Sequence, residues 1–217
     1  DEHGQKMQQT AEKEGITPLA LADRNSAVFR DLLKRLNCSN DDFIRTTEAR
    51  HVTACQTLWN ALKRNGEIYS GKYEGWYAVR DEAFYDESEI TKNADGDRIA
   101  PTGAPVEWVK EESYFFPLSK WRDTLLEFYD AHPEFIGPKS RFNEVYSFVK
   151  GGLMDLSISR TAFSWGIPVP GDEKHVMYVW IDALTNYITG LGYPGDTADF
   201  ATFWSTPDSY AMHMVGK

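Results

Sequence analysis

The residues best placed to do chemistry lie in one stretch, residues 175–187, which reads HVMYVWIDALTNY. Residues 176–181 are β-branched and aromatic without polar alternation, which is typical of a strand buried on both faces of a parallel sheet. Asp182 is a residue type that caps helices, so we expect a helix to begin there. The strand and the helix would then meet at one corner, and open α/β sheets bind ligands at such corners.

The side chains at this corner are mainly apolar and aromatic. Trp180 is the last large residue of the expected strand, and Tyr187 lies about one helical turn after Ala183 and Leu184 on the same face. Together with Val179 they would line an apolar pocket that contains one hydroxyl. The residue types alone leave a second interpretation open, in which Trp180 and Tyr187 are ordinary core residues at a sheet edge.

Alternating helices and strands must position this corner, and the first 66 residues have such a pattern. The expected helices cover residues 4–15, 17–36 and 47–66, and a short strand covers residues 42–45. Thr17 and Thr47 are N-cap residue types, Pro18 suits a first helical turn, and Gly15 and Gly66 suit helix ends. This order of elements is typical of an α/β sheet.

The pattern changes at about Glu67. Residues 68–116 consist of short aromatic and β-branched runs separated by the turn-like segments SGKYEG, KNADGD and APTGAP, which predicts a small β-rich insertion. Two helices are expected after it, at residues 119–129 with Ser119 as the cap and at residues 141–149. The parallel-sheet pattern resumes near residue 176, so the insertion interrupts an α/β sheet.

Several short motifs together resemble one enzyme family. They are YVWIDALTNY at residues 178–187, DLSISR at residues 155–160, WGIPVP at residues 165–170, DEHGQK at residues 1–6 and HMVGK at residues 213–217. In this combination they resemble the catalytic region of methionyl-tRNA synthetases of the bacterial and organellar type. The resemblance extends over essentially the whole chain.

The resemblance implies a fold and a division of the chain. The fold would be α/β, a partial class I synthetase Rossmann-like parallel sheet that is interrupted by an α+β connective-peptide insertion. Residues 1–46 and 163–217 would form the two parts of the catalytic core. Residues 47–162 would form the insertion with its flanking helices, which in this family faces the acceptor end of tRNA.

The resemblance also implies roles for individual residues. A methionine thioether packs against aromatic rings with a gain of roughly 0.3–1.5 kcal/mol. The apolar pocket for it would be lined by Val179, Trp180, Ala183, Leu184 and Tyr187. Asp1 would hold the α-ammonium group of methionine, and Arg160 would be a catalytic cation near the reacting phosphates. Gly216 and Lys217 belong to a G-K-D fingerprint that approaches ATP.

The implied activity of the intact enzyme is the activation of L-methionine with ATP and Mg²⁺, followed by transfer of methionine from the adenylate to tRNA(Met). The H-x-G-H and K-M-S-K-S motifs of the family do not occur in residues 1–217. We therefore expect these residues to be an internal portion that is inactive by itself. Two alternatives stay open: another class I synthetase for an apolar amino acid, or a noncatalytic homologue that binds tRNA or protein.

The insertion of this family often carries zinc knuckles. The equivalent positions here are Ala78, Asp81, Ala100 and Gly103, which include no thiol. Because structural zinc needs four ligands, mainly thiolate or imidazole, we expect an insertion without structural zinc. Aromatic side chains would hold it together instead, namely Tyr73, Trp76, Tyr77, Phe84, Tyr85 and Trp108.

Composition bounds the remaining possibilities. Cys38 and Cys55 fall within helical patterns, so we expect two buried free thiols rather than a disulfide framework. No stretch is long enough for a membrane span, and the first residues are not a basic and apolar leader, which favours the cytoplasm. The net charge of −10 argues against nonspecific coating of nucleic acid.

Overall fold

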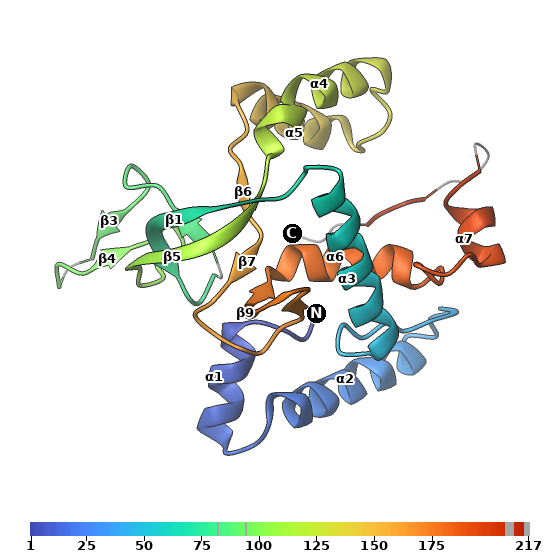
Figure 1. Ribbon diagram of the computed structural model, residues 1–217, viewed down its shortest axis with the longest axis horizontal. Helices are drawn as coiled ribbons and strands as arrows, with labels where there is room; N and C mark the ends of the chain where they lie inside the picture. The colour runs from blue at the N-terminus through green and yellow to red at the C-terminus, as the bar shows by residue number, and fades with distance from the viewer. Residues whose placement is uncertain (82, 94, 207–210, 215–217) are drawn as a thin grey trace.

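The computed structural model describes residues 1–81, 83–93, 95–206 and 211–214, except for the side chains of Tyr73 and Glu111 (Figure 1). Its α-helices are α1 (Gln5–Glu14), α2 (Pro18–Arg35), α3 (Ala49–Arg64), α4 (Arg122–Ala131), α5 (Lys139–Gly151), α6 (Val179–Thr189) and α7 (Ala198–Phe203). Its strands are β1 (Tyr69–Ala78), β2 (Ala83–Tyr85), β3 (Thr91–Lys92), β4 (Arg98–Ile99), β5 (Glu107–Phe116), β6 (Leu156–Ser157), β7 (Ser159–Arg160), β8 (Pro168–Val169) and β9 (Asp172–Met177).

The first two helices begin and end where their capping residues predict. Gly15 takes a left-handed conformation with φ of 69° and ends α1, because glycine has no Cβ to oppose that conformation. The Thr17 hydroxyl accepts a hydrogen bond from the Ala20 N–H at 3.1 Å and caps α2. Both helix predictions are confirmed.

The segment between α2 and α3 differs from the prediction. Residues 42–45, which are all described, belong to no strand or helix, so the expected short strand is wrong. The N-cap of α3 is Glu48 rather than Thr47, and the Thr47 hydroxyl instead donates to the Glu2 carboxylate at 2.5 Å. Arg45 binds the same carboxylate, so this segment is held by side chains rather than by a sheet.

The β-rich character predicted for residues 68–116 is confirmed, and this segment is built on one long hairpin. Strands β1 and β5 pair antiparallel over nearly their whole length, from Tyr69 opposite Phe115 to Tyr77 opposite Glu107. The sheet order is β2-β1-β5-β6, and β3 with β4 forms a separate two-stranded ribbon. Aromatic pairs cross the hairpin as expected, among them Trp76 with Trp108, whose ring centroids are 5.2 Å apart.

Two helices follow the hairpin and lie at one end of the molecule (Figure 1). The helix expected from Ser119 begins with a 3-10 turn, η1 (Leu118–Trp121), and continues as α4. Ser119 therefore lies inside the turn rather than at a helix cap, and its N–H donates to Asp155 at 3.1 Å. The second expected helix corresponds to α5, which is longer than predicted.

The segment before α6 is a small antiparallel sheet with the order β7-β9-β8. Every strand pair among the described residues is antiparallel, so the expectation of a strand at residues 176–181 in a parallel sheet is wrong. Strand β9 ends at Met177, and Tyr178 is the N-cap of α6. Asp182 is consequently not a helix cap but a buried residue in the first turns of α6.

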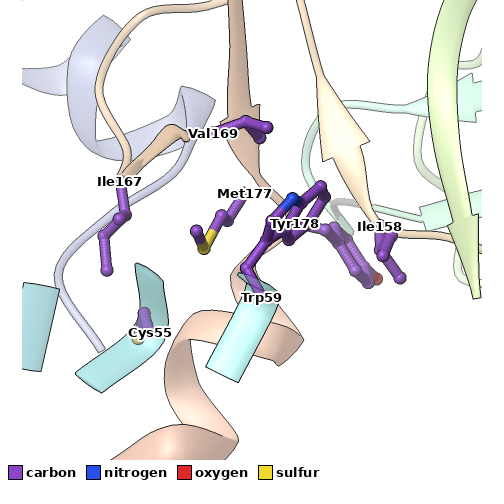
Figure 2. Packing of buried hydrophobic residues seen from close by; sticks show 7 residues of the cluster. All are labelled: Cys55, Trp59, Ile158, Ile167, Val169, Met177 and Tyr178. Atoms are coloured by element: carbon purple, nitrogen blue, oxygen red, sulfur yellow. The ribbon is translucent and has the colours of Figure 1, made fainter. Parts of the chain in front are cut away.

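The main core joins α3 to this small sheet (Figure 2). Its buried members are Cys55, Trp59, Ile158, Ile167, Val169, Met177 and Tyr178. The Trp59 ring is fully buried and meets the Tyr114 ring edge to face at 5.5 Å between centroids. The core therefore packs α3 against the small sheet, and strand β9 of this sheet leads into α6. This packing fixes where α6 begins.

The cysteine prediction is half correct. Cys55 is buried in the core, and burial raises the pKa of its thiol to about 12. Cys38 is exposed, because it follows the end of α2 at a point where the chain has left the helix. Both thiols are free. Separately, the described helices include none that is long and apolar enough to cross a membrane.

Candidate functional site

Helix α6 carries the five predicted pocket residues. Trp180, Leu184 and Tyr187 follow the i, i+4, i+7 spacing of one helical face, and their residues are 55%, 55% and 43% exposed. Val179 and Ala183 are half-buried, and Val179 packs against the main core rather than on this exposed face. The structure thus brings the predicted residues together on a helix rather than across a strand and a helix. Their aromatic and aliphatic side chains form an open apolar face.

His213 adds a third ring to this face. Its imidazole meets the Tyr187 ring edge to face, with the centroids 4.2 Å apart. His213 belongs to the motif HMVGK, but the sequence alone indicated no role for it in the pocket. Gly216 and Lys217, the predicted ATP-binding residues, lie outside the described residues.

The opposite face of α6 is buried and polar. Asp182, Thr185 and Thr189 are all at most 2% exposed. The two carboxylate oxygens of Asp182 face two imidazoles: Oδ2 lies 2.5 Å from His3 Nδ1, and Oδ1 lies 2.7 Å from His51 Nε2. Burial by itself would raise the pKa of Asp182, but hydrogen bonds and electrostatic attraction to His3 and His51 hold it below its ordinary value.

Sequence reasoning missed this buried cluster of Asp182, His3 and His51. Its three members lie far apart in the chain, and neither imidazole belongs to a motif that gives it a partner. One signal was present: an aspartate within an otherwise apolar segment needs partners if that segment is buried.

The two acidic residues at the start of the chain have different environments. Asp1 is exposed. Glu2 is buried, and its carboxylate accepts hydrogen bonds from Arg45 Nε at 2.8 Å and from the Thr47 hydroxyl. The Glu2 carbonyl also accepts a bond from Trp165 Nε1 at 2.7 Å. Glu2 therefore anchors this segment, whereas the Asp1 carboxylate faces solvent.

Arg160, the predicted catalytic cation, is only 4% exposed. Its Nη1 donates to the Ser159 carbonyl at 2.7 Å and to the Ser157 hydroxyl at 2.8 Å. Its guanidinium lies over the Tyr178 ring at 4.3 Å and over the Phe84 ring at 5.2 Å. These contacts join the insertion, through Phe84, to the segment that precedes α6.

Two groups of residues lie at positions where a metal could be bound. His51, Cys55 and Asp182 offer ligand atoms within 4.8 Å of one another. However, His51 and Asp182 already bind each other, and the Cys55 thiol is held in its protonated form, which is a poor ligand. This group is better described as a hydrogen-bonded cluster.

The positions equivalent to zinc ligands in the insertion contain a different arrangement. Ala78 and Ala100 are buried in a small apolar cluster with Ala104. Asp81 accepts hydrogen bonds from the hydroxyls of Tyr85 and Thr102, the former at 3.0 Å. Apolar packing and hydrogen bonds therefore hold these positions together.

Comparison with known proteins places this geometry in a family. The family model described as tRNA synthetases class I (M) matches residues 1–217. Curated relatives that match the whole chain include methionine–tRNA ligases of Mesorhizobium japonicum (61% identical), Brucella suis (60%) and Rickettsia typhi (62%). The chain spans 41% of the length of each of these relatives.

Solved structures agree with this result. A Mycobacterium tuberculosis methionyl-tRNA synthetase bound by methionyl-adenylate matches with a TM-score of 0.90 and 53% identity over 94% of this chain and 40% of that one. The free form of the M. tuberculosis enzyme matches with a TM-score of 0.77 and 54% identity over 85% of this chain and 38% of that one. The mixed α/β fold of class I synthetases that the sequence predicts is thereby confirmed. The chain belongs to the family of class I tRNA synthetases (M).

Proposed function

We propose that the intact protein is a methionyl-tRNA synthetase that activates L-methionine with ATP and transfers it to tRNA(Met) in the cytoplasm. The observation that carries the proposal is the outward face of α6, where Trp180, Leu184 and Tyr187 form an exposed apolar surface. The contact between His3 and Asp182 ties the segment that bears Asp1 to the opposite face of the same helix. The identity of about 60% to methionine–tRNA ligases over the whole chain supports it.

In this proposal the face of α6 forms one side of the amino-acid pocket. The thioether of methionine packs against the Trp180 and Tyr187 rings, and the Tyr187 hydroxyl donates to the sulfur. The exposed carboxylate of Asp1 pairs with the α-ammonium group. The methionine carboxylate then displaces pyrophosphate from the α-phosphorus of ATP. Mg²⁺, bound with ATP, would neutralise charge on the phosphates.

We assign Gly216 and Lys217 to ATP binding. Arg160 acts near the phosphates only if its buried contacts rearrange, so its present geometry supports a role in holding the insertion to the core. Residues 1–46 and 163–217 are parts of the catalytic core, and residues 47–162 are the insertion with flanking helices, of which α3 packs on the core.

Replacing Tyr187 with phenylalanine in the intact protein should reduce the discrimination between methionine and norleucine by roughly 1–3 kcal/mol. The reason is that the variant loses only the hydroxyl, which donates a hydrogen bond to the methionine sulfur. The ratio of kcat/KM for the two amino acids in pyrophosphate exchange measures this. Equal losses for methionine and norleucine would contradict the role of the hydroxyl.

Trp180→Ala is the matched control for apolar contact. Because Trp180 is 55% exposed, its removal should weaken binding of methionine and norleucine alike while the melting temperature stays nearly constant.

A panel of apolar amino acids in the same assay distinguishes methionine activation from the two alternative functions, another class I synthetase and a noncatalytic homologue. Exchange with a different amino acid would indicate another synthetase, and exchange with none would indicate a noncatalytic homologue.

We also propose that the insertion folds without structural zinc. Asp81 is the one carboxylate among the four equivalent positions, and it is already bound by Tyr85 and Thr102. Chelators should therefore leave the melting temperature unchanged, whereas Asp81→Ala should lower the free energy of unfolding by about 1–2 kcal/mol. Elemental analysis of washed, zinc-supplemented protein completes the test, and one zinc per chain would contradict the proposal.

A further inference from the structure

The cluster of Asp182, His3 and His51 joins three parts of the chain that lie far apart in sequence. Asp182 belongs to α6, His51 to the first turn of α3, and His3 to the segment before α1. His3 and Asp182 are separated by 179 positions, and His51 and Asp182 by 131. All three side chains are at most 8% exposed. The cluster is therefore a buried connection between α6 and the start of the chain.

Its hydrogen bonds are complete on the carboxylate and on the His51 ring. Each oxygen of Asp182 faces one imidazole nitrogen. The other nitrogen of His51 lies 3.0 Å from the Thr189 hydroxyl, which donates to the Thr185 carbonyl at 3.0 Å. The Trp165 ring meets the His3 ring at 5.3 Å between centroids and limits its rotation. Such a network defines one position for α6 rather than a range of positions.

The buried cluster is close in sequence to the residues of the proposed amino-acid site, but its own side chains are not exposed at that site. Asp182 is two residues after Trp180 and two before Leu184, yet it points into the protein while those side chains point out. Likewise, His3 is two residues after Asp1, and its side chain is buried whereas Asp1 is exposed. The bond between His3 and Asp182 therefore sets the separation between the Asp1 carboxylate and the outward face of α6.

We propose that Asp182 is a positioning residue for amino-acid binding, which holds α6 through His3 and His51 so that the face of Trp180, Leu184 and Tyr187 stands at the correct separation from Asp1. The proposal deepens the proposed methionine activation and rests on it. A displacement of about 1 Å in a positioned group can cost a hundredfold in rate, so a small shift of α6 is sufficient for a large effect.

The test is methionine-dependent pyrophosphate exchange by the intact protein with the variant Asp182→Asn. Asparagine keeps the shape of the side chain but can accept from only one of the two imidazoles without facing the other with its amide N–H. We expect the KM for methionine to rise at least tenfold while the KM for ATP changes less than twofold. Val149→Ala, which truncates a buried side chain in α5, lowers stability away from this cluster and should leave both KM values unchanged.

A second pair of variants keeps the test decisive if Asp182→Asn does not fold. His3→Asn retains a nitrogen donor near the position of Nδ1 and should keep the KM for methionine within about threefold, whereas His3→Leu should raise it at least tenfold. Equal KM values for methionine in His3→Asn and His3→Leu, or parallel rises in both KM values, would overturn the proposal.

The wild-type protein separates this inference from the proposed function. If it exchanges pyrophosphate with methionine but Asp182→Asn has a normal KM, the positioning role alone fails. If it responds instead to another amino acid, the methionine assignment fails, and the same comparison with that amino acid decides the role of Asp182. If it responds to no amino acid, both fail.

Discussion

Replacing Trp59 with alanine in the intact protein should lower the free energy of unfolding by about 3–5 kcal/mol. Trp59 is fully buried in the core between α3 and the strands that precede α6, so its removal leaves a large cavity (Figure 2). Urea unfolding followed by circular dichroism measures the change. It should also weaken amino-acid binding, since the same core fixes where α6 begins.

The variant Trp59→Phe separates the effect of lost side-chain volume from the effect of the indole N–H. Trp59 Nε1 is buried without a hydrogen-bond partner among the described residues. Trp59→Phe removes that unsatisfied donor while keeping an aromatic ring, so it should cost less than half as much as Trp59→Ala. Phe148→Ala, at a site that is 71% exposed, is the surface control and should change the stability by less than about 0.5 kcal/mol. Equal losses for Trp59→Ala and Phe148→Ala would contradict the assignment of Trp59 to the core.

The second large effect concerns the adjacent acids Asp1 and Glu2. Glu2→Ala should destabilise the protein by about 3–5 kcal/mol, because it removes a buried carboxylate and leaves the Arg45 side chain, which is only 17% exposed, without its main partner. The hydrogen bond that Arg45 donates to Glu2 is the principal cause that raises the pKa of Arg45. Arg45 stays charged without this bond, because a guanidinium is always protonated in proteins. The exposed Asp23, which lies 2.7 Å from Arg45 Nη1, compensates only in part.

Asp1→Ala is the matched comparison at the neighbouring position. It should leave the melting temperature nearly unchanged, because Asp1 is exposed, but should reduce kcat/KM for methionine by about 10- to 150-fold through loss of one charged hydrogen bond. Thermal unfolding and pyrophosphate exchange on both variants measure the two effects. Loss of stability in Asp1→Ala with normal stability in Glu2→Ala would reverse the two assignments.

The sequence by itself determined features that depend on near neighbours. Helices α1 and α2 were predictable because Gly15, Thr17 and Pro18 act on backbone groups within one turn of themselves. The β-rich insertion was predictable because short aromatic runs between turn residues favour hairpins. The family was recognisable because each of its motifs is a short run of adjacent residues, which the sequence shows directly.

The tertiary structure alone decided the boundary between β9 and α6. Residues 176–181 are apolar enough to be buried either as a strand or as a helix, so the pattern could not fix the boundary. Antiparallel pairing with β7 and β8 extends only to Met177, and α6 begins at Val179. The predicted pocket residues consequently lie on one helix.

The tertiary structure also decided which polar residues are buried. Asp1 and Glu2 are neighbours of similar chemistry, but only Glu2 meets Arg45 and Thr47. Asp182 has the residue type of a helix cap, yet it binds His3 and His51, which are more than a hundred positions away. A carboxylate can be buried only where cationic or hydrogen-bonding partners converge, and that convergence is a property of the folded chain rather than of any local sequence.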